Sequence, residues 1–423
     1  MQPPSPPPKP ARDHPLEGLR GLCAGAVLFA HAFAPAASLD PSWAPPRQFW
    51  WFNLGYAAVM MFFVLSGYVI GLTTMRPASA EETRRYLARR ALRLVPISTA
   101  AVLLAWALQP EIAGRTVLGN LLFLQNSAPY PGGVYFDLMP NNLNLWSLNH
   151  EVVYYLGFLA LWGWKPRAGV VWAGLAVLTL APLAGFAPAS LSARWACGGL
   201  YWLAGLSVAW RTPPPEPGER RSDWPAALLG AYALWTLAPL RSVLFALDVK
   251  SLMWLTPVAP HRLDFLPACV WVLLAVTGRA PRLRRILGWV CLSWATLTLA
   301  YYAMSHTLVE LDQVAGVALA LAWLCRRWTP STRPLAWLAP LGAISFGIYA
   351  FALPIQFAQH GLVRSWSGSA LTYATRLGVM LLIVGGLAWW FECRLQPWLR
   401  RRFLPGDARK FSRETSPQTN SSG

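Results

Sequence analysis

The sequence contains few charged residues, and acidic residues are the scarcest of these. Only 13% of its 423 residues are Asp, Glu, Lys or Arg, about half the share usual in soluble proteins. Hydrophobic residues make up 55%, and the mean hydropathy is +0.37. This composition excludes a disordered chain and an ordinary soluble enzyme. It is typical of a protein that crosses a lipid bilayer several times.

Other absences narrow the class further. The six cysteines all lie in or beside apolar runs, and they form neither a CxxC pair nor a metal-ligand spacing, so we expect no disulfide framework and no metal site. The net charge of +18 is spread between apolar runs rather than over a soluble face, which argues against a nucleic-acid partner. We see no cleavable signal peptide, because the first 15 residues are polar and rich in proline.

Apolar runs occur along almost the whole chain. A helix needs about 20 residues to cross the apolar core of a bilayer, and several of the runs are shorter. We therefore predict an all-α polytopic bundle of ten to twelve transmembrane helices, with a re-entrant or interfacial helix from Thr116 to Leu124. The runs cover residues 16–36, 53–75, 94–109, 146–164, 168–184, 196–210, 224–240, 264–277, 286–304, 311–325, 335–357 and 371–394.

The basic residues predict the orientation of the bundle. Alternate connecting segments hold 28 of the 36 Lys and Arg residues, and positive loops remain in the cytoplasm. Both termini are therefore expected on the cytoplasmic side. We divide the chain into a disordered Pro-rich tail (1–15), a membrane domain (16–402) and a polar tail (403–423). No internal repeat is visible.

Ionisable side chains inside apolar spans are costly, so each is a functional hypothesis. Arg20 and His31 lie eleven residues apart in the first span, which puts both on one helix face, about 16 Å apart along the axis. Arg90 and Arg93 share a face at the start of the third span, where basic residues also set topology. Their guanidinium forks suit the phosphates of a cytosolic cosubstrate.

Two further polar patterns enter apolar helices. In the second span, Ser66 and Gly67 precede Tyr68, and small residues of this kind usually serve close helix packing. The segment from Trp146 to Tyr155 places Ser147 and Glu151 four residues apart, with Asn149 and His150 between them. A carboxylate near a helix start also serves the helix dipole, which is the simpler interpretation of Glu151.

Together these motifs resemble the integral-membrane acyltransferase family 3, the O-acyltransferases of bacterial surface polysaccharides, antibiotics and related acceptors. Glu17-Gly18-Leu19-Arg20 with His31 is similar to the Arg-x10-His signature of that family, and Arg90-Ala91-Leu92-Arg93 to its Arg-x-x-Arg pair. Residues 62–68 match its second-helix motif, and Trp146-Ser147-Leu148 with Glu151 its Trp-Ser-Leu-x-x-Glu motif. Residues 341–349 and 391–397 resemble its last two helices, so the likeness covers nearly the whole chain.

The sequence departs from the family pattern in the penultimate helix. Many members have a His-containing motif there, whereas this chain has Ala352. The role of that second His is either absent or taken by His150, His306 or His360.

The resemblance implies transfer of an acyl group from acyl-CoA, with acetyl-CoA as the expected donor, to a hydroxyl of a saccharide, glycolipid or small exported acceptor. No tightly bound cofactor is expected, and the location would be the bacterial inner membrane. His31 is the candidate general base, and Glu151 would orient it or replace it. Arg20, Arg90 and Arg93 would hold acyl-CoA. Hydrogen bonds to the acceptor or the oxyanion would come from the candidate side chains Ser66, Tyr68, Trp146, Ser147 and Asn149.

Two other classes fit parts of the pattern. A secondary transporter or flippase would also have many spans and polar groups at mid-membrane depth, but it usually shows repeated halves. A non-catalytic membrane scaffold would not require His31 and Glu151 inside apolar spans.

Overall fold

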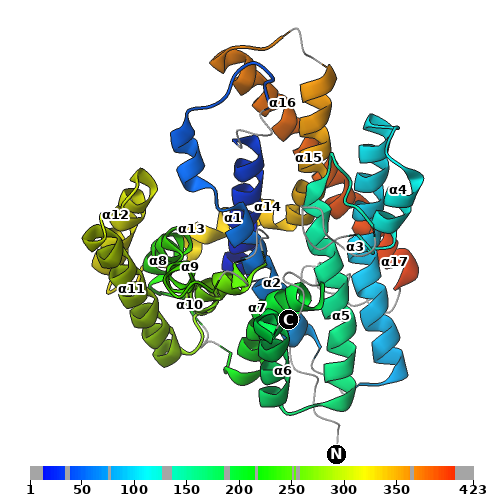
Figure 1. Cartoon of the computed structure of the whole chain (residues 1–423). Helices are drawn as coiled ribbons and strands as arrows, with labels where there is room; N and C mark the ends of the chain where they lie inside the picture. Colours follow the sequence, from blue (N-terminus) through cyan, green and yellow to red (C-terminus); the bar gives the residue numbers. More distant parts are fainter. Residues whose placement is uncertain are drawn as a thin grey trace, which may run out of the picture.

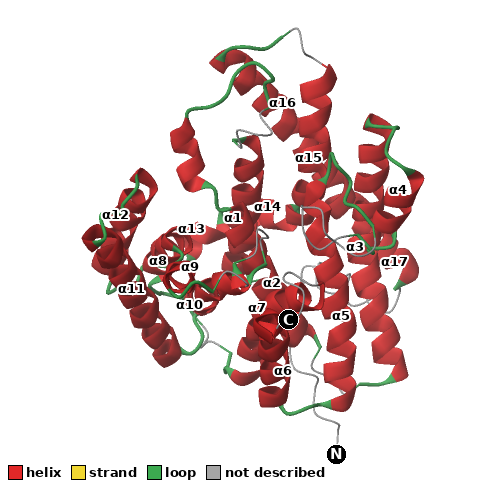
Figure 2. Cartoon of the chain, in the orientation of Figure 1, coloured by secondary structure: helices red, strands yellow, loops and turns green. Residues whose placement is uncertain are grey.

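The computed structural model of the chain describes residues 13–33, 39–74, 78–125, 136–184, 191–214, 218–249, 252–253, 258–362 and 366–404. These residues form helices and three isolated bridges, and no strand forms within those ranges (Figure 2). The all-α prediction is therefore confirmed. The predicted tails fall mostly outside the described residues, although the first helix already begins at His14.

The helices follow the predicted apolar runs closely. Their bounds are α1 (His14–Ala32), α2 (Gly55–Thr73), α3 (Ala80–Leu108), α4 (Gly114–Leu121), α5 (Trp146–Trp164), α6 (Ala168–Leu180), α7 (Leu191–Arg211), α8 (Trp224–Leu237), α9 (Pro239–Ala246), α10 (Leu266–Thr277), α11 (Pro281–Met304), α12 (Glu310–Cys325), α13 (Arg333–Ala336), α14 (Ala339–Ala343), α15 (Ser345–Leu362), α16 (Ala370–Trp389) and α17 (Gln396–Phe403). Short 3₁₀ helices are η2 (Arg47–Phe52), η3 (Leu143–Leu145), η4 (Ala181–Ala184) and η6 (Pro260–Phe265), and η7 (Trp390–Leu395) is a π-helix.

Five helical stretches of the described residues are long and apolar enough to cross a membrane. They are Arg47–Thr73, Ala80–Leu108, Trp224–Ala246, Pro281–Met304 and Ala370–Phe403. The count of ten to twelve crossings and the cytoplasmic placement of both termini stay predictions.

Capping residues determine where several helices begin. Asp13 caps α1, because its Oδ1 accepts a hydrogen bond from Leu16 N at 3.3 Å. Ser79 caps α3 in the same way through Glu82 N at 3.2 Å. Each cap provides an acceptor for a backbone N–H that has no partner inside the helix. Residues next to the chain positions where they begin therefore determine the starts of α1, which carries Arg20, and of α3, which carries Arg93.

Glycine allows α2 and α7 to pack with their backbones in contact. A Cβ atom on Gly67 would lie 1.9 Å from Trp202 O, and one on Gly205 would lie 1.9 Å from Val64 O. Small residues permit this approach where apolar helices gain little from burying more side chain. The contact holds α2 in the centre of the bundle. In Figure 1, α8, α10, α11 and α12 lie on one side of α1 and α2, and α3, α5 and α17 lie on the other.

The predicted span 335–357 is wrong as a single helix. It is divided into α13, α14 and α15, with turns at 337–338 and 344. The reason is close packing on α1, since a Cβ atom on Gly18 would lie 1.8 Å from Leu335 O and one on Gly342 would lie 1.9 Å from Glu17 O. A continuous helix along one axis would not follow α1 this closely. The break directs α15 past the residues around Arg20.

Candidate active site

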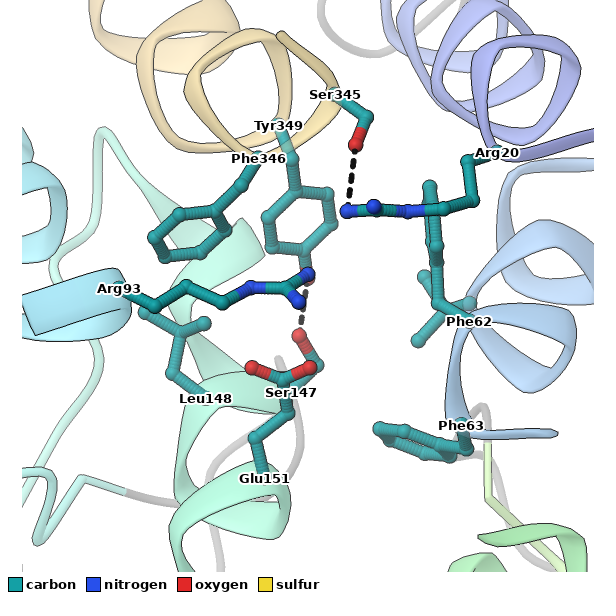
Figure 3. Close-up of a pocket in the computed structure, with 11 residues that line it drawn as sticks. Arg20, Phe62, Phe63, Arg93, Ser147, Leu148, Glu151, Ser345, Phe346 and Tyr349 are labelled. Carbon is teal, nitrogen blue, oxygen red and sulfur yellow. Dashed lines mark hydrogen bonds between the residues drawn. The ribbon is translucent and has the colours of Figure 1, made fainter. Parts of the chain in front are cut away.

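A pocket opens between α1, α2, α3, α5 and α15 (Figure 3). The volume open to a water-sized molecule in it is about 40 Å³. A few charged and hydroxyl groups converge in an otherwise apolar enclosure, which is the usual composition of a small-molecule site. The lining consists of Arg20, Val59, Phe62, Phe63, Arg93, Ser147, Leu148, Glu151, Ser345, Phe346 and Tyr349.

Arg20 is held by its own helix and by α15. Its Nη1 donates to Glu17 Oε1, one turn earlier, at 3.1 Å, and its Nη2 donates to Ser345 Oγ at 3.3 Å. The Arg20 side chain is 15% exposed. Because both contacts lie where α13 and α14 pack against α1, the break that separates α15 from α14 also orients this side chain.

Arg93 enters the pocket from the opposite side. In Figure 3 its guanidinium lies next to the carboxylate of Glu151 and points toward Arg20. Glu151 attracts Arg93, whereas Arg20 and Arg93 repel each other. Glu17 pairs with Arg20, and Glu151 lies beside Arg93, so carboxylates partly balance the two positive charges. The guanidiniums still bring N–H donors to the pocket, and such donors suit an anionic or strongly polarised ligand.

A chain of hydrogen bonds joins α5 to α15 at the edge of the pocket. The hydroxyls of Ser147 and Tyr349 lie 2.6 Å apart. Tyr349 also donates to the backbone carbonyl of Asn144, and Asn144 Nδ2 donates to Tyr349 O at 3.1 Å. Since both ends are fixed, the Ser147–Tyr349 pair is preorganised as a hydrogen-bonding group for a bound molecule.

A proline in α15 explains part of this connection. Pro354 has no N–H, so the carbonyl of Ala350 lacks its partner within the helix. Asn142 Nδ2 supplies the missing hydrogen bond at 3.0 Å. The segment that precedes α5 is therefore anchored to α15, the helix that carries Tyr349.

His31 does not line this pocket. Its side chain interacts with that of Asn144, and its carbonyl accepts from Gln356 Nε2 at 3.1 Å. Asn144 in turn contacts Tyr349, so His31 reaches the pocket through two intervening residues. Arg20 and His31 share a helix, but only Arg20 lies in the cavity.

Arg90, Ser66 and Tyr68 lie outside the lining. The Arg90 guanidinium packs over the rings of Tyr86 and Tyr155, at 5.3 and 5.4 Å from their centroids. Ser66 interacts with the Tyr155 hydroxyl. Tyr68 is 2% exposed, and its ring faces the guanidinium of Arg279 at 5.4 Å.

The remaining predicted donors fix the first turns of α5. Asn149 Nδ2 donates to Phe123 O at 2.8 Å, and its Oδ1 accepts from Trp195 Nε1 at 2.6 Å. Trp146 is buried edge-to-face against Phe63, with centroids 6.3 Å apart. These contacts position Ser147 and Glu151 without facing the cavity.

The histidines considered as substitutes for the family's second His are spread over the molecule. His150 is fully buried and stacks on Phe63 at 5.6 Å. His306 follows α11 with a positive φ of 54°, and His360 lies near the end of α15. None of the three lines the pocket, and Ala352 is fully buried.

Sequence reasoning assigned no role to Ser345, Tyr349 or Glu392. Ser345 and Tyr349 are four residues apart in an apolar helix, the same spacing as Ser147 and Glu151, and this signal could have identified them. Glu392 lies in the π-helix η7, and its Oε2 accepts from Gly347 N at 2.9 Å. No periodicity in the sequence indicates that contact.

Among the described residues, no group of three His, Cys, Asp or Glu side chains could hold a metal ion. Comparison with curated proteins and with solved structures found no match. A family model described as an acyltransferase domain, that of acyltransferase 3, matches residues 13–392. The match spans every element that contributes to the pocket, from α1 to α15. The chain therefore belongs to the acyltransferase 3 family of membrane proteins.

Proposed function

We propose that this acyltransferase moves an acyl group, acetyl in the first instance, from acyl-CoA to a hydroxyl of a saccharide, glycolipid or other exported acceptor in the bacterial inner membrane. One observation carries the proposal. The pocket combines two facing guanidiniums, a carboxylate and a preorganised pair of hydroxyls.

Each group has a task in acyl transfer. The acceptor oxygen attacks the thioester carbonyl carbon and loses its proton to a base, a C–O bond forms, and the C–S bond breaks to release CoA thiol. Arg20 and Arg93 hold the anionic donor. One hydroxyl of the Ser147–Tyr349 pair turns its proton from its present acceptor to the oxygen that gains charge.

His31 is our candidate for the base, because it occupies the His position of the family motif and an imidazole nitrogen can accept a proton. Its interaction with Asn144 connects it to the Tyr349 end of the pocket. Glu151 is the alternative base, since its carboxylate lies in the lining. Substituting His31 and Glu151 one at a time shows which of the two acts as the base.

The experiment uses the purified full chain in detergent with acetyl-CoA and a panel of hydroxylated saccharides and glycolipids. We expect release of free CoA thiol that depends on the acceptor, with label from the acetyl group recovered in the acceptor. Membrane passage of a solute without any thiol release would instead indicate the transporter or flippase alternative and overturn the proposal.

A further inference from the structure

The short helix α17 lies antiparallel to the beginning of α3, at the far right of the view in Figure 1. Gln396 Nε2 donates to the carbonyl of Arg93 at 2.9 Å. This hydrogen bond sets the register between the two helices at the residue that also lines the pocket.

The register places a further arginine beside the Arg-x-x-Arg pair. Arg400 is one helical turn after Gln396, so it lies on the face of α17 that contacts α3. The Arg400 guanidinium experiences the charges of Arg93 and Arg90 and, less strongly, that of Arg89.

This assembly of like charges is unfavourable unless an anion joins it. The carboxylate that acts on Arg400 is Glu392, but Glu392 already accepts a hydrogen bond from Gly347 N and also attracts Arg93 and Arg20. Glu151 acts on Arg93 and Arg90 but also on Arg20, so neither carboxylate serves Arg400 alone.

Membrane topology alone does not explain the position of Arg400. Arg401 and Arg402 follow it directly and are also exposed, and they supply positive charge to the same segment. Arg402 is about 200° around the helix from Arg400, on the opposite face. Arg400 is the member of this run that the electrostatic coupling links to the start of α3.

We propose that Arg400 of α17 completes, with Arg90 and Arg93, a binding site for the phosphate groups of the CoA moiety. The inference rests on the proposed function, because it takes acyl-CoA as the donor. The nucleotide end would lie between α3 and α17, and the acyl end would enter the pocket that Arg93 lines. Guanidinium forks suit phosphate oxygens bidentately.

The test measures binding, so it needs no identified acceptor. Calorimetric titration of the purified full chain with CoA and with pantetheine, which lacks the phosphates, compares the wild type with Arg400→Ala, Arg400→Lys and Arg402→Ala. We expect Arg400→Ala to weaken CoA binding about 10- to 100-fold, the range for one charge-assisted contact. Arg400→Lys should lose less, and pantetheine binding should not change.

Arg402→Ala is the matched control, because it removes the same charge from the other face of the same helix. If Arg400→Ala and Arg402→Ala weaken CoA binding equally, the cause is general surface charge and the proposal of a site at Arg400 is wrong. If Arg400→Ala weakens CoA binding only in nanodiscs that contain anionic lipid, Arg400 binds a lipid headgroup and the proposed site is overturned. If the wild type itself does not bind CoA, the proposed donor is wrong. If the wild type and Arg400→Ala bind CoA equally, only the role of Arg400 fails.

Discussion

Tyr349 offers the sharpest test of the candidate site, because one oxygen atom separates it from phenylalanine. Its hydroxyl lies 2.6 Å from Ser147 Oγ and donates to the Asn144 carbonyl. Tyr349→Phe removes both contacts and leaves the ring in place. We predict that the variant folds and loses catalytic turnover.

The expected size of the loss depends on what the hydroxyl does. If it donates a hydrogen bond to the developing oxyanion, kcat should fall about 100- to 1000-fold, or about 2.7–4 kcal/mol in the barrier. If it serves only to join α5 to α15, the variant should instead lose stability. The free energy of unfolding should fall by about 1–3 kcal/mol for each buried partner left without a hydrogen bond. A catalytic role should therefore appear in kcat, and a purely structural role in the unfolding temperature.

Tyr154→Phe is the matched control. The Tyr154 hydroxyl donates to Trp195 O at 3.2 Å, and Tyr154 lies on α5 but outside the pocket lining. Release of CoA thiol gives kcat and KM for each variant, and thermal unfolding in detergent gives its stability. Equal kcat in Tyr349→Phe and the wild type would refute the assignment of the Ser147–Tyr349 pair to catalysis.

Three further tests address the base, the fold and a buried carboxylate. His31→Ala should lower kcat about 100- to 10,000-fold with little change in KM; activity near that of the wild type, together with a large loss in Glu151→Gln, would transfer the role of base to Glu151. Gly18→Ala should prevent stable folding, because its Cβ would lie 1.8 Å from Leu335 O, whereas Gly25→Ala on the same helix meets no atom within 4 Å and should unfold at or above the wild-type temperature. Burial raises the pKa of Asp40, but hydrogen bonds from the Thr372 side chain and two backbone amides outweigh this and hold the pKa below its ordinary value of 3.8. The ionised carboxylate therefore stabilises the fold above that pH, and the stability is lost as pH falls through the folded-state pKa. Thermal unfolding of Asp40→Asn should depend less on pH below about 4 than unfolding of the wild type, and identical pH profiles would contradict this.

The sequence predicted the helices well, because apolar runs and caps act locally. α5 begins at Trp146, where the predicted run begins, and the short helix expected near Thr116 is present as α4. Arg20, Arg93, Ser147 and Glu151 were also identified as charged or polar side chains in or beside apolar spans, and they all line one pocket. These features depend on residues close together in the chain.

Contacts between distant segments could not be predicted in the same way. Tyr68 appears in the sequence as a hydroxyl in a family motif, but its ring faces Arg279, which lies more than 200 residues later. His31 shares a helix face with Arg20, yet the neighbouring segments determine that His31 contacts Asn144 while Arg20 reaches the cavity. Helical periodicity gives the face of a residue but not the partner that covers that face.

The break in the span 335–357 shows how backbone contact, rather than side-chain chemistry, builds this site. Gly18 and Gly342 let α13 and α14 pack directly on the first turns of α1, and α15 then begins at Ser345, within hydrogen-bonding distance of Arg20. One turn later the same helix presents Tyr349 to Ser147. The same contact of α13 and α14 with α1 therefore positions both the Arg20 guanidinium and the Ser147–Tyr349 hydroxyl pair. A larger side chain at Gly18 should disturb both ends of the pocket together, even though glycine itself takes no part in the chemistry.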